Sequence, residues 1–186
     1  MALISQLLTT DLIWFGVGII FLLGYFWLRK MIPHHAIFSL NYQSIMKTFI
    51  IPTITIFVVL SIFRFAAGIL LIEAGAKNIF SLLSYIIIGP FFEELFIRGL
   101  ILGGAFFLSS RIDNKKASWA FIILGFIIQL FVFVWIHGYT DTIRIIYLTI
   151  IGITYSLLFI INKRDVLPAM IAHAIGNAMI ILGVFA

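Results

Sequence analysis

Apolar residues occur along this chain in long blocks separated by short polar segments. A helix that crosses a bilayer needs about 20 consecutive, mainly apolar residues. The pattern predicts about six such helices, at residues 12–29, 48–73, 79–108, 118–138, 144–162 and 166–186. Arg64 interrupts the second block, which leaves open whether residues 64–77 also span the membrane. We therefore expect an all-α, polytopic membrane protein.

The composition supports this class. Of the 186 residues, 63% are hydrophobic and 10% are charged, whereas soluble domains are roughly 45–50% apolar and about 25% charged. The chain has no cysteine, which excludes disulfides, thiol nucleophiles and cysteine-ligated metals. Its basic residues flank the apolar blocks, which is a topology signal. The lipid bilayer is the expected partner, no nucleic acid is expected, and no pattern specifies an oligomeric state.

Lysine and arginine are unevenly distributed over the predicted loops. The first, third and fifth loops hold eight of them: Arg29, Lys30, Lys47, Arg111, Lys115, Lys116, Lys163 and Arg164. The second and fourth loops hold only Lys77 and Arg144. Cytoplasmic loops carry the excess of basic residues. We therefore expect a protein of the cell membrane with loops 1, 3 and 5 in the cytoplasm and both termini outside.

The third predicted helix contains Glu93, Glu94 and Arg98 within an apolar block. Each charge in the middle of a membrane costs roughly 2.5–3.5 kcal/mol on insertion scales, so these groups require partners. The i,i+4 spacing of Glu94 and Arg98 places a carboxylate and a guanidinium on one helical face. Glu93 is rotated about 100° from Glu94, so it must face a wet cavity or a polar group of another helix.

Two other predicted helices carry polar residues. His137 ends the fourth, and His173 and Asn177 lie i,i+4 in the sixth. A single histidine could simply join two helices, but ionisable groups on three spans indicate a functional site. His137 lies about 20 residues from the cytoplasmic end of its helix and His173 only about 7, or ~30 and ~10 Å. Either the fourth helix begins well inside the cytoplasm and is tilted, or the chain near Gly138 dips into the bundle.

Several protease chemistries are excluded by the motifs that are missing. The sequence has neither HExxH nor GxSxG, and Asp141 is the one aspartate that could face the membrane, so an aspartyl dyad is excluded. What remains is a glutamate with histidine and amide side chains. This set suits general-base activation of water, with separate donors for a developing oxyanion.

Three segments match the motifs of one family. EELFIR fits EExxxR, FVWIH fits FxxxH and HAIGN fits HxxxN, in this order along the chain. The chain therefore resembles the CPBP family of CAAX proteases and bacteriocin-processing enzymes, also called the Abi family. The resemblance divides the chain into a variable region of two helices and a cytoplasmic loop at residues 1–77 and a catalytic four-helix core at residues 78–186.

The resemblance implies an intramembrane endopeptidase with its active site between helices 3, 4 and 6. It assigns Glu93 and His137 to holding and activating a water molecule, and His173 and Asn177 to the oxyanion hole. No cofactor is needed in this scheme. The expected substrate is a peptide or protein at the membrane, such as a bacteriocin, a signalling peptide or a membrane-associated protein.

The resemblance also makes Glu94 and Arg98 a supporting pair that fixes the geometry of Glu93. Two alternatives stay open. A catalytic Zn²⁺ could be held by Glu93, His137 and His173, which would leave one coordination position free. Alternatively, the polar residues could hold together a non-catalytic scaffold or a bacteriocin-immunity protein.

Overall fold

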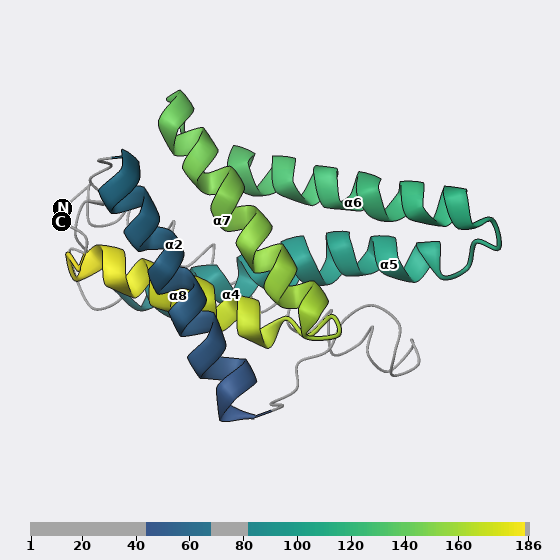
Figure 1. Ribbon diagram of the computed structural model, residues 1–186. Coiled ribbons are helices and arrows are strands. Elements are labelled where there is room, and N and C mark those ends of the chain that lie inside the picture. The colour runs from purple at the N-terminus through teal and green to yellow at the C-terminus, as the bar shows by residue number, and fades with distance from the viewer. Residues whose placement is uncertain (1–43, 68–81, 185–186) are drawn as a thin grey trace, which may run out of the picture.

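The computed structural model describes residues 44–67 and 82–184, which are helical apart from short connections (Figure 1). The elements, in chain order, are η1 (Met46–Ile50), α2 (Ile51–Ala67), η2 (Ser84–Ile88), α4 (Gly89–Glu94), η3 (Leu95–Leu102), α5 (Gly103–Ser109), α6 (Lys115–Ile136), α7 (Thr142–Ile161) and α8 (Leu167–Ile181). The symbol η marks a π-helical segment, which is wider than an α-helix. Within the described residues the predicted all-α class is confirmed.

Three segments of the described chain are long and apolar enough to cross a membrane: Met46–Phe65, Lys115–Ile136 and Thr142–Ile161. They correspond to the second, fourth and fifth predicted spans. The sixth corresponds to the shorter apolar helix α8. The first predicted span, at residues 12–29, lies outside the described residues, as does the end of the second. The number of six spans, the topology and the division at residue 77 stay predictions.

The third predicted span is a series of α- and π-helical segments rather than one regular helix. Helix α4 begins directly after η2, and Pro90 lies in its first turn. Because proline has no N–H to donate, the change from π- to α-helix falls where the hydrogen-bond ladder loses a donor. A second π-helical segment begins at Leu95, directly after the two glutamates. Such segments are frequent at functional sites.

The ends of α6 determine where His137 lies. The side chain of Asn114 caps the helix by accepting two backbone N–H groups of the first turn. The helix ends at Ile136 with His137 as its C-cap residue, and Gly138 then adopts a φ of 65°, a left-handed conformation that suits glycine. This turn leads to Asp141, the cap of α7. Helix α6 therefore places His137 at the end opposite to Asn114.

The arrangement of the hairpin explains how two histidines at different positions along their helices can meet. In Figure 1, the hairpin of α5 and α6 extends past the connection between α7 and α8. Helix α6 therefore starts beyond the end of the bundle at which α8 begins, and its other end brings His137 Nε2 to 3.9 Å from the Glu93 oxygen that His173 also faces. This arrangement agrees with the first explanation in that α6 begins beyond α8, while the position and tilt of α6 in the membrane stay predictions.

Gly152 of α7 lies where α6 packs closely against α7. A Cβ atom added there would lie 2.7 Å from Leu130 Cδ1 and 2.9 Å from Phe133 Cδ1. We expect Gly152→Ala to lower the free energy of unfolding by about 1–3 kcal/mol, the usual cost of overpacking. Thermal unfolding of the purified protein in detergent measures this change. Gly104→Ala is the control, because a Cβ at Gly104 would meet no atom within 4 Å; equal losses in the two variants would contradict the prediction.

Candidate active site

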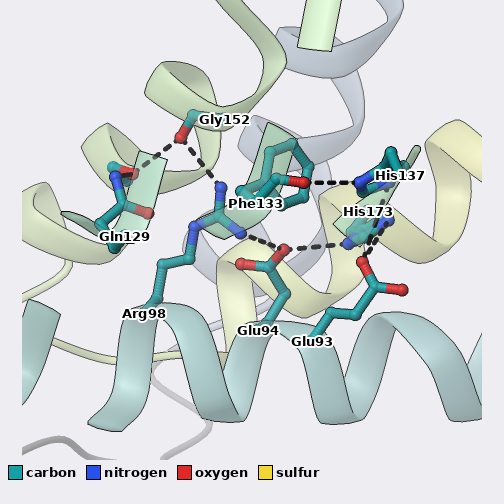
Figure 2. Close-up of polar contacts among 9 residues, drawn as sticks. Glu93, Glu94, Arg98, Gln129, Phe133, His137, Gly152 and His173 are labelled. Atoms are coloured by element: carbon teal, nitrogen blue, oxygen red, sulfur yellow. Dashed lines mark hydrogen bonds and ion pairs between the residues drawn. The ribbon is translucent and has the colours of Figure 1, made fainter. Parts of the chain in front are cut away.

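Three side chains from three separate helices converge on one point (Figure 2). Glu93 comes from α4, His137 from the end of α6 and His173 from α8. Glu93 Oε2 lies 3.9 Å from His137 Nε2 and 4.0 Å from His173 Nε2. The sequence places these residues on different helices, and the fold brings them together. The predicted meeting of Glu93 with both histidines is therefore present.

The other nitrogen of each imidazole has an oxygen partner. His137 Nδ1 lies 2.7 Å from the carbonyl oxygen of Phe133, and His173 Nδ1 lies 2.9 Å from Glu94 Oε1. Both partners only accept, which assigns the proton of each neutral ring to Nδ1. Each Nε2 then presents a lone pair toward Glu93.

Glu93 completes a site made of three acceptors. Its Oε2 is buried and makes no hydrogen bond with any part of the chain that the structure describes. A carboxylate oxygen and two imidazole lone pairs repel one another unless a donor or a cation lies between them. The arrangement suits a water molecule, which offers two hydrogens, or a metal ion.

The predicted pair of Glu94 and Arg98 is confirmed as a contact. Arg98 Nη1 lies 3.0 Å from Glu94 Oε1, and both side chains are completely buried. The same Glu94 oxygen accepts from His173, and Arg98 Nη2 donates to the carbonyl of Gly152 at 3.0 Å. No hydrogen bond joins Glu93 to this pair within the described residues. Through Glu94, the pair therefore contacts His173 rather than Glu93.

Two aromatic rings enclose the polar groups. The Arg98 guanidinium lies 4.3 Å from the centre of the Phe133 ring, and that ring lies 4.7 Å from the ring of His137. Tyr155 stacks on His173 with ring centres 4.9 Å apart and an angle of 24°. The sequence pattern does not distinguish Tyr155, because one tyrosine in an apolar helix resembles an ordinary packing residue.

Asn177 lies one helical turn after His173 but has a different partner. Its Nδ2 donates to the carbonyl of Tyr85 in η2 at 2.8 Å. Among the described residues, no hydrogen bond links it to Glu93, His137 or His173. Its assignment to an oxyanion hole stays a prediction.

Two further buried polar residues, Gln129 and Ser156, belong to none of the three sequence motifs. Gln129 Nε2 donates to Ser156 Oγ at 2.9 Å, and both side chains are completely buried. A signal for Gln129 was present, since Gln129, Phe133 and His137 are spaced by four residues and share one face of α6. Nothing comparable distinguishes Ser156.

The donor set also fits a zinc ion. One ligand atom each from Glu93, His137 and His173 can be chosen so that all three lie within 4.8 Å of one another. Zinc holds nitrogen and oxygen ligands at about 2.0–2.2 Å, so a small inward movement of these side chains would be required. In both histidines Nδ1 lies within hydrogen-bond distance of an oxygen, which leaves Nε2 for the metal. Metal-bound histidines have the same kind of contact at their other ring nitrogen.

The described helices are apolar, and they bring a glutamate and two histidines to one point, a set of side chains suited to general-base chemistry. A family model described as type II CAAX prenyl endopeptidase Rce1-like matches residues 75–179. The match covers more than half of the chain, which therefore belongs to this family, and it confirms the resemblance to CAAX proteases. No curated protein and no solved structure matched the chain. Family membership and the apolar helices together identify a membrane protease that acts on a peptide or protein.

Proposed function

We propose that the chain is an intramembrane endopeptidase in which Glu93 activates a water molecule. The observation that supports this most directly is the convergence of Glu93 Oε2 with two imidazole Nε2 atoms at 3.9 and 4.0 Å. A water molecule held there can donate one hydrogen to the carboxylate and one to an imidazole. Its oxygen is then oriented for attack on a carbonyl carbon.

The proposed reaction is a hydrolysis in two steps. The water oxygen bonds to the carbonyl carbon of the scissile peptide, while its proton passes to Glu93. Glu93 then returns that proton to the leaving amine as the C–N bond breaks. His137 orients the water in the first step.

His173 and Asn177 are proposed to stabilise the oxyanion. For this role His173 must carry a second proton on Nε2, in addition to the Nδ1 proton that faces Glu94 Oε1. Asn177 Nδ2 has two hydrogens, of which the Tyr85 carbonyl takes one. The second remains for the substrate oxygen.

The proposed substrate is a bacteriocin, a signalling peptide or a membrane-associated protein. The matching family is described by its action as a CAAX prenyl endopeptidase, so a prenylated CAAX-type peptide is a further candidate. Side-chain exposure is 31% for Glu93 and 22% for His137, against 4% for His173. A substrate would therefore approach from the side of Glu93 and His137.

Comparison of peptide termini tests the proposal without a known substrate. Wild type and Glu93→Gln would be produced at matched levels in the native host, and the termini of membrane and secreted fractions compared by mass spectrometry. Termini present only with the wild type would establish proteolysis and identify the substrate. Identical termini, with any cellular phenotype retained by the variant, would instead support a scaffold or immunity protein.

The zinc-dependent version of this protease is the second candidate, and the compatible ligand set supports it. If bound, zinc would supply Lewis-acid activation of water. Under the proposal preferred here, dialysis against EDTA followed by 1,10-phenanthroline is expected to leave the cleavage rate unchanged. Metal content is measured on the same samples. Loss of cleavage with loss of about one zinc per chain, and recovery when zinc is restored, would favour the alternative.

A further inference from the structure

Gln129 and Ser156 form a buried polar contact that takes no part in the proposed chemistry. Ser156 Oγ donates to the carbonyl of Gly152 at 2.7 Å, and Gln129 Nε2 donates to Ser156 Oγ at 2.9 Å. Gln129 belongs to α6, whereas Ser156 and Gly152 belong to α7. The contact therefore joins these two helices deep inside the bundle.

The Gly152 carbonyl connects this contact to the active site. It also accepts from Arg98 Nη2, and Arg98 binds Glu94, which binds His173 (Figure 2). An unbroken series of hydrogen bonds thus runs from Gln129 to His173. Its distances all lie between 2.7 and 3.0 Å.

Helix α6 also carries the other histidine. Gln129 lies two turns before His137 on the same face, and the buried ring of Phe133 lies between them. Arg98 binds the Gly152 carbonyl of α7 and is linked through Glu94 to His173. The position of α6 relative to α7 therefore sets the distance between His137 and this series of residues. Because a Cβ at Gly152 would come within 3 Å of two α6 side chains, the helices approach closely here.

The stability of the fold alone does not explain why residue 129 is a glutamine. A serine in an apolar helix can satisfy its hydroxyl on the carbonyl four residues earlier, as Ser156 does, so Ser156 needs no glutamine. A buried amide must be desolvated, a cost that an apolar side chain of the same size would avoid. What the amide adds is a directional contact that fixes α6 against α7.

We propose that Gln129 is a positioning residue of the active site. Through Ser156 and Gly152, it holds α6 where His137 Nε2 and His173 Nε2 both face Glu93. This inference rests on the proposed function. Errors of about 1 Å in such an arrangement can lower a rate by ~10²-fold, so a shift of α6 would affect turnover directly.

Gln129→Met tests the proposal, because methionine has a similar length but cannot make this hydrogen bond. The probe is an internally quenched peptide that spans the cleavage site defined by the wild-type termini. We expect kcat to fall about 10- to 100-fold, with KM and the unfolding temperature close to those of wild type. Ile127→Met, on the exposed side of the same helix, is the matched control and is expected to leave kcat unchanged.

A double variant tests whether the two residues act as a unit. Ser156→Ala is expected to lower kcat as Gln129→Met does, and the combined variant is expected to fall no further than the lower single variant. An unchanged kcat in Gln129→Met, or a fall that only follows a loss of folded protein, would overturn the positioning role.

Nitrogen NMR of ¹⁵N-histidine-labelled, full-length protein separates this inference from the proposed function. We expect Gln129→Met, but not Ile127→Met, to shift the His137 and His173 resonances. If Glu93→Gln cleaves as fast as wild type, the proposed function fails, and unchanged resonances in Gln129→Met then overturn the positioning role as well. If Glu93→Gln is inactive while Gln129→Met keeps full kcat, the positioning role alone fails.

Discussion

Replacement of Glu93 by glutamine is expected to lower the rate of peptide-bond hydrolysis by about 10²–10⁴-fold, the usual contribution of a positioned general base. Glutamine keeps the size of the side chain but cannot accept the proton of water. In the proposed reaction the two imidazoles near Glu93 Oε2 orient the water and the oxyanion, and Glu93 alone takes the proton. Initial cleavage rates of the purified protein measure the effect.

Two controls make this result specific. Glu93→Asp retains a carboxylate but withdraws it by about one bond length, and a misplacement of about 1 Å can cost ~10²-fold, so some activity should remain above that of Glu93→Gln. Asp113→Asn removes an exposed carboxylate from the connection between α5 and α6 and should have no effect. Full activity in Glu93→Gln would refute the proposed chemistry.

Replacement of Arg98 by methionine is expected to cost about 3–5 kcal/mol of stability, the usual result of removing one partner of a buried ion pair. Arg98 and Glu94 are both completely buried, so the remaining carboxylate would have no access to solvent. His173 would then be the remaining side-chain partner of Glu94 among the described residues. Chemical or thermal unfolding in detergent, monitored by circular dichroism, measures the loss.

Arg144→Met is the matched control for this experiment. Arg144 pairs with Asp141 at 3.5 Å, but more than half of each side chain is exposed, and exposed pairs contribute about 0–1 kcal/mol. A combined Glu94→Gln and Arg98→Met variant should recover part of the loss, because it leaves no unpaired charge. If Arg98→Met and Arg144→Met are equally stable, the buried pair does not have the importance argued here.

The site could be predicted from the sequence where its contacts are local. Glu94 and Arg98 are four residues apart on one helix, so any helical turn brings them together, and the contact is present at 3.0 Å. The polar residues of the three motifs could be recognised because charged and imidazole side chains are rare within apolar spans. The fourth and fifth spans were located to within a few residues, because long apolar blocks end at capping residues such as Asn114 and Asp141.

The tertiary structure decided which groups face one another. Glu94 and His173 are 79 residues apart, and Asn177 and Tyr85 are 92 apart. Neither contact follows from a helical period, since each depends on how two helices cross. The sequence predicted that Glu94 and Arg98 support Glu93, whereas in the structure Arg98 binds Glu94 and Glu94 contacts His173.

The sequence by itself determined the helical class, the apolar blocks and the residues able to perform hydrolysis, because these follow from hydrophobicity and from spacing within single helices. Only the tertiary structure decided that α6 extends beyond α8, that His137 and His173 face the same oxygen of Glu93, and that Gln129 reaches Ser156. Helix packing sets these relations through close approach at positions such as Gly125 and Gly152. The physical reason is that local periodicity fixes the face on which a side chain lies, whereas the partner of that face depends on the packing of the whole bundle.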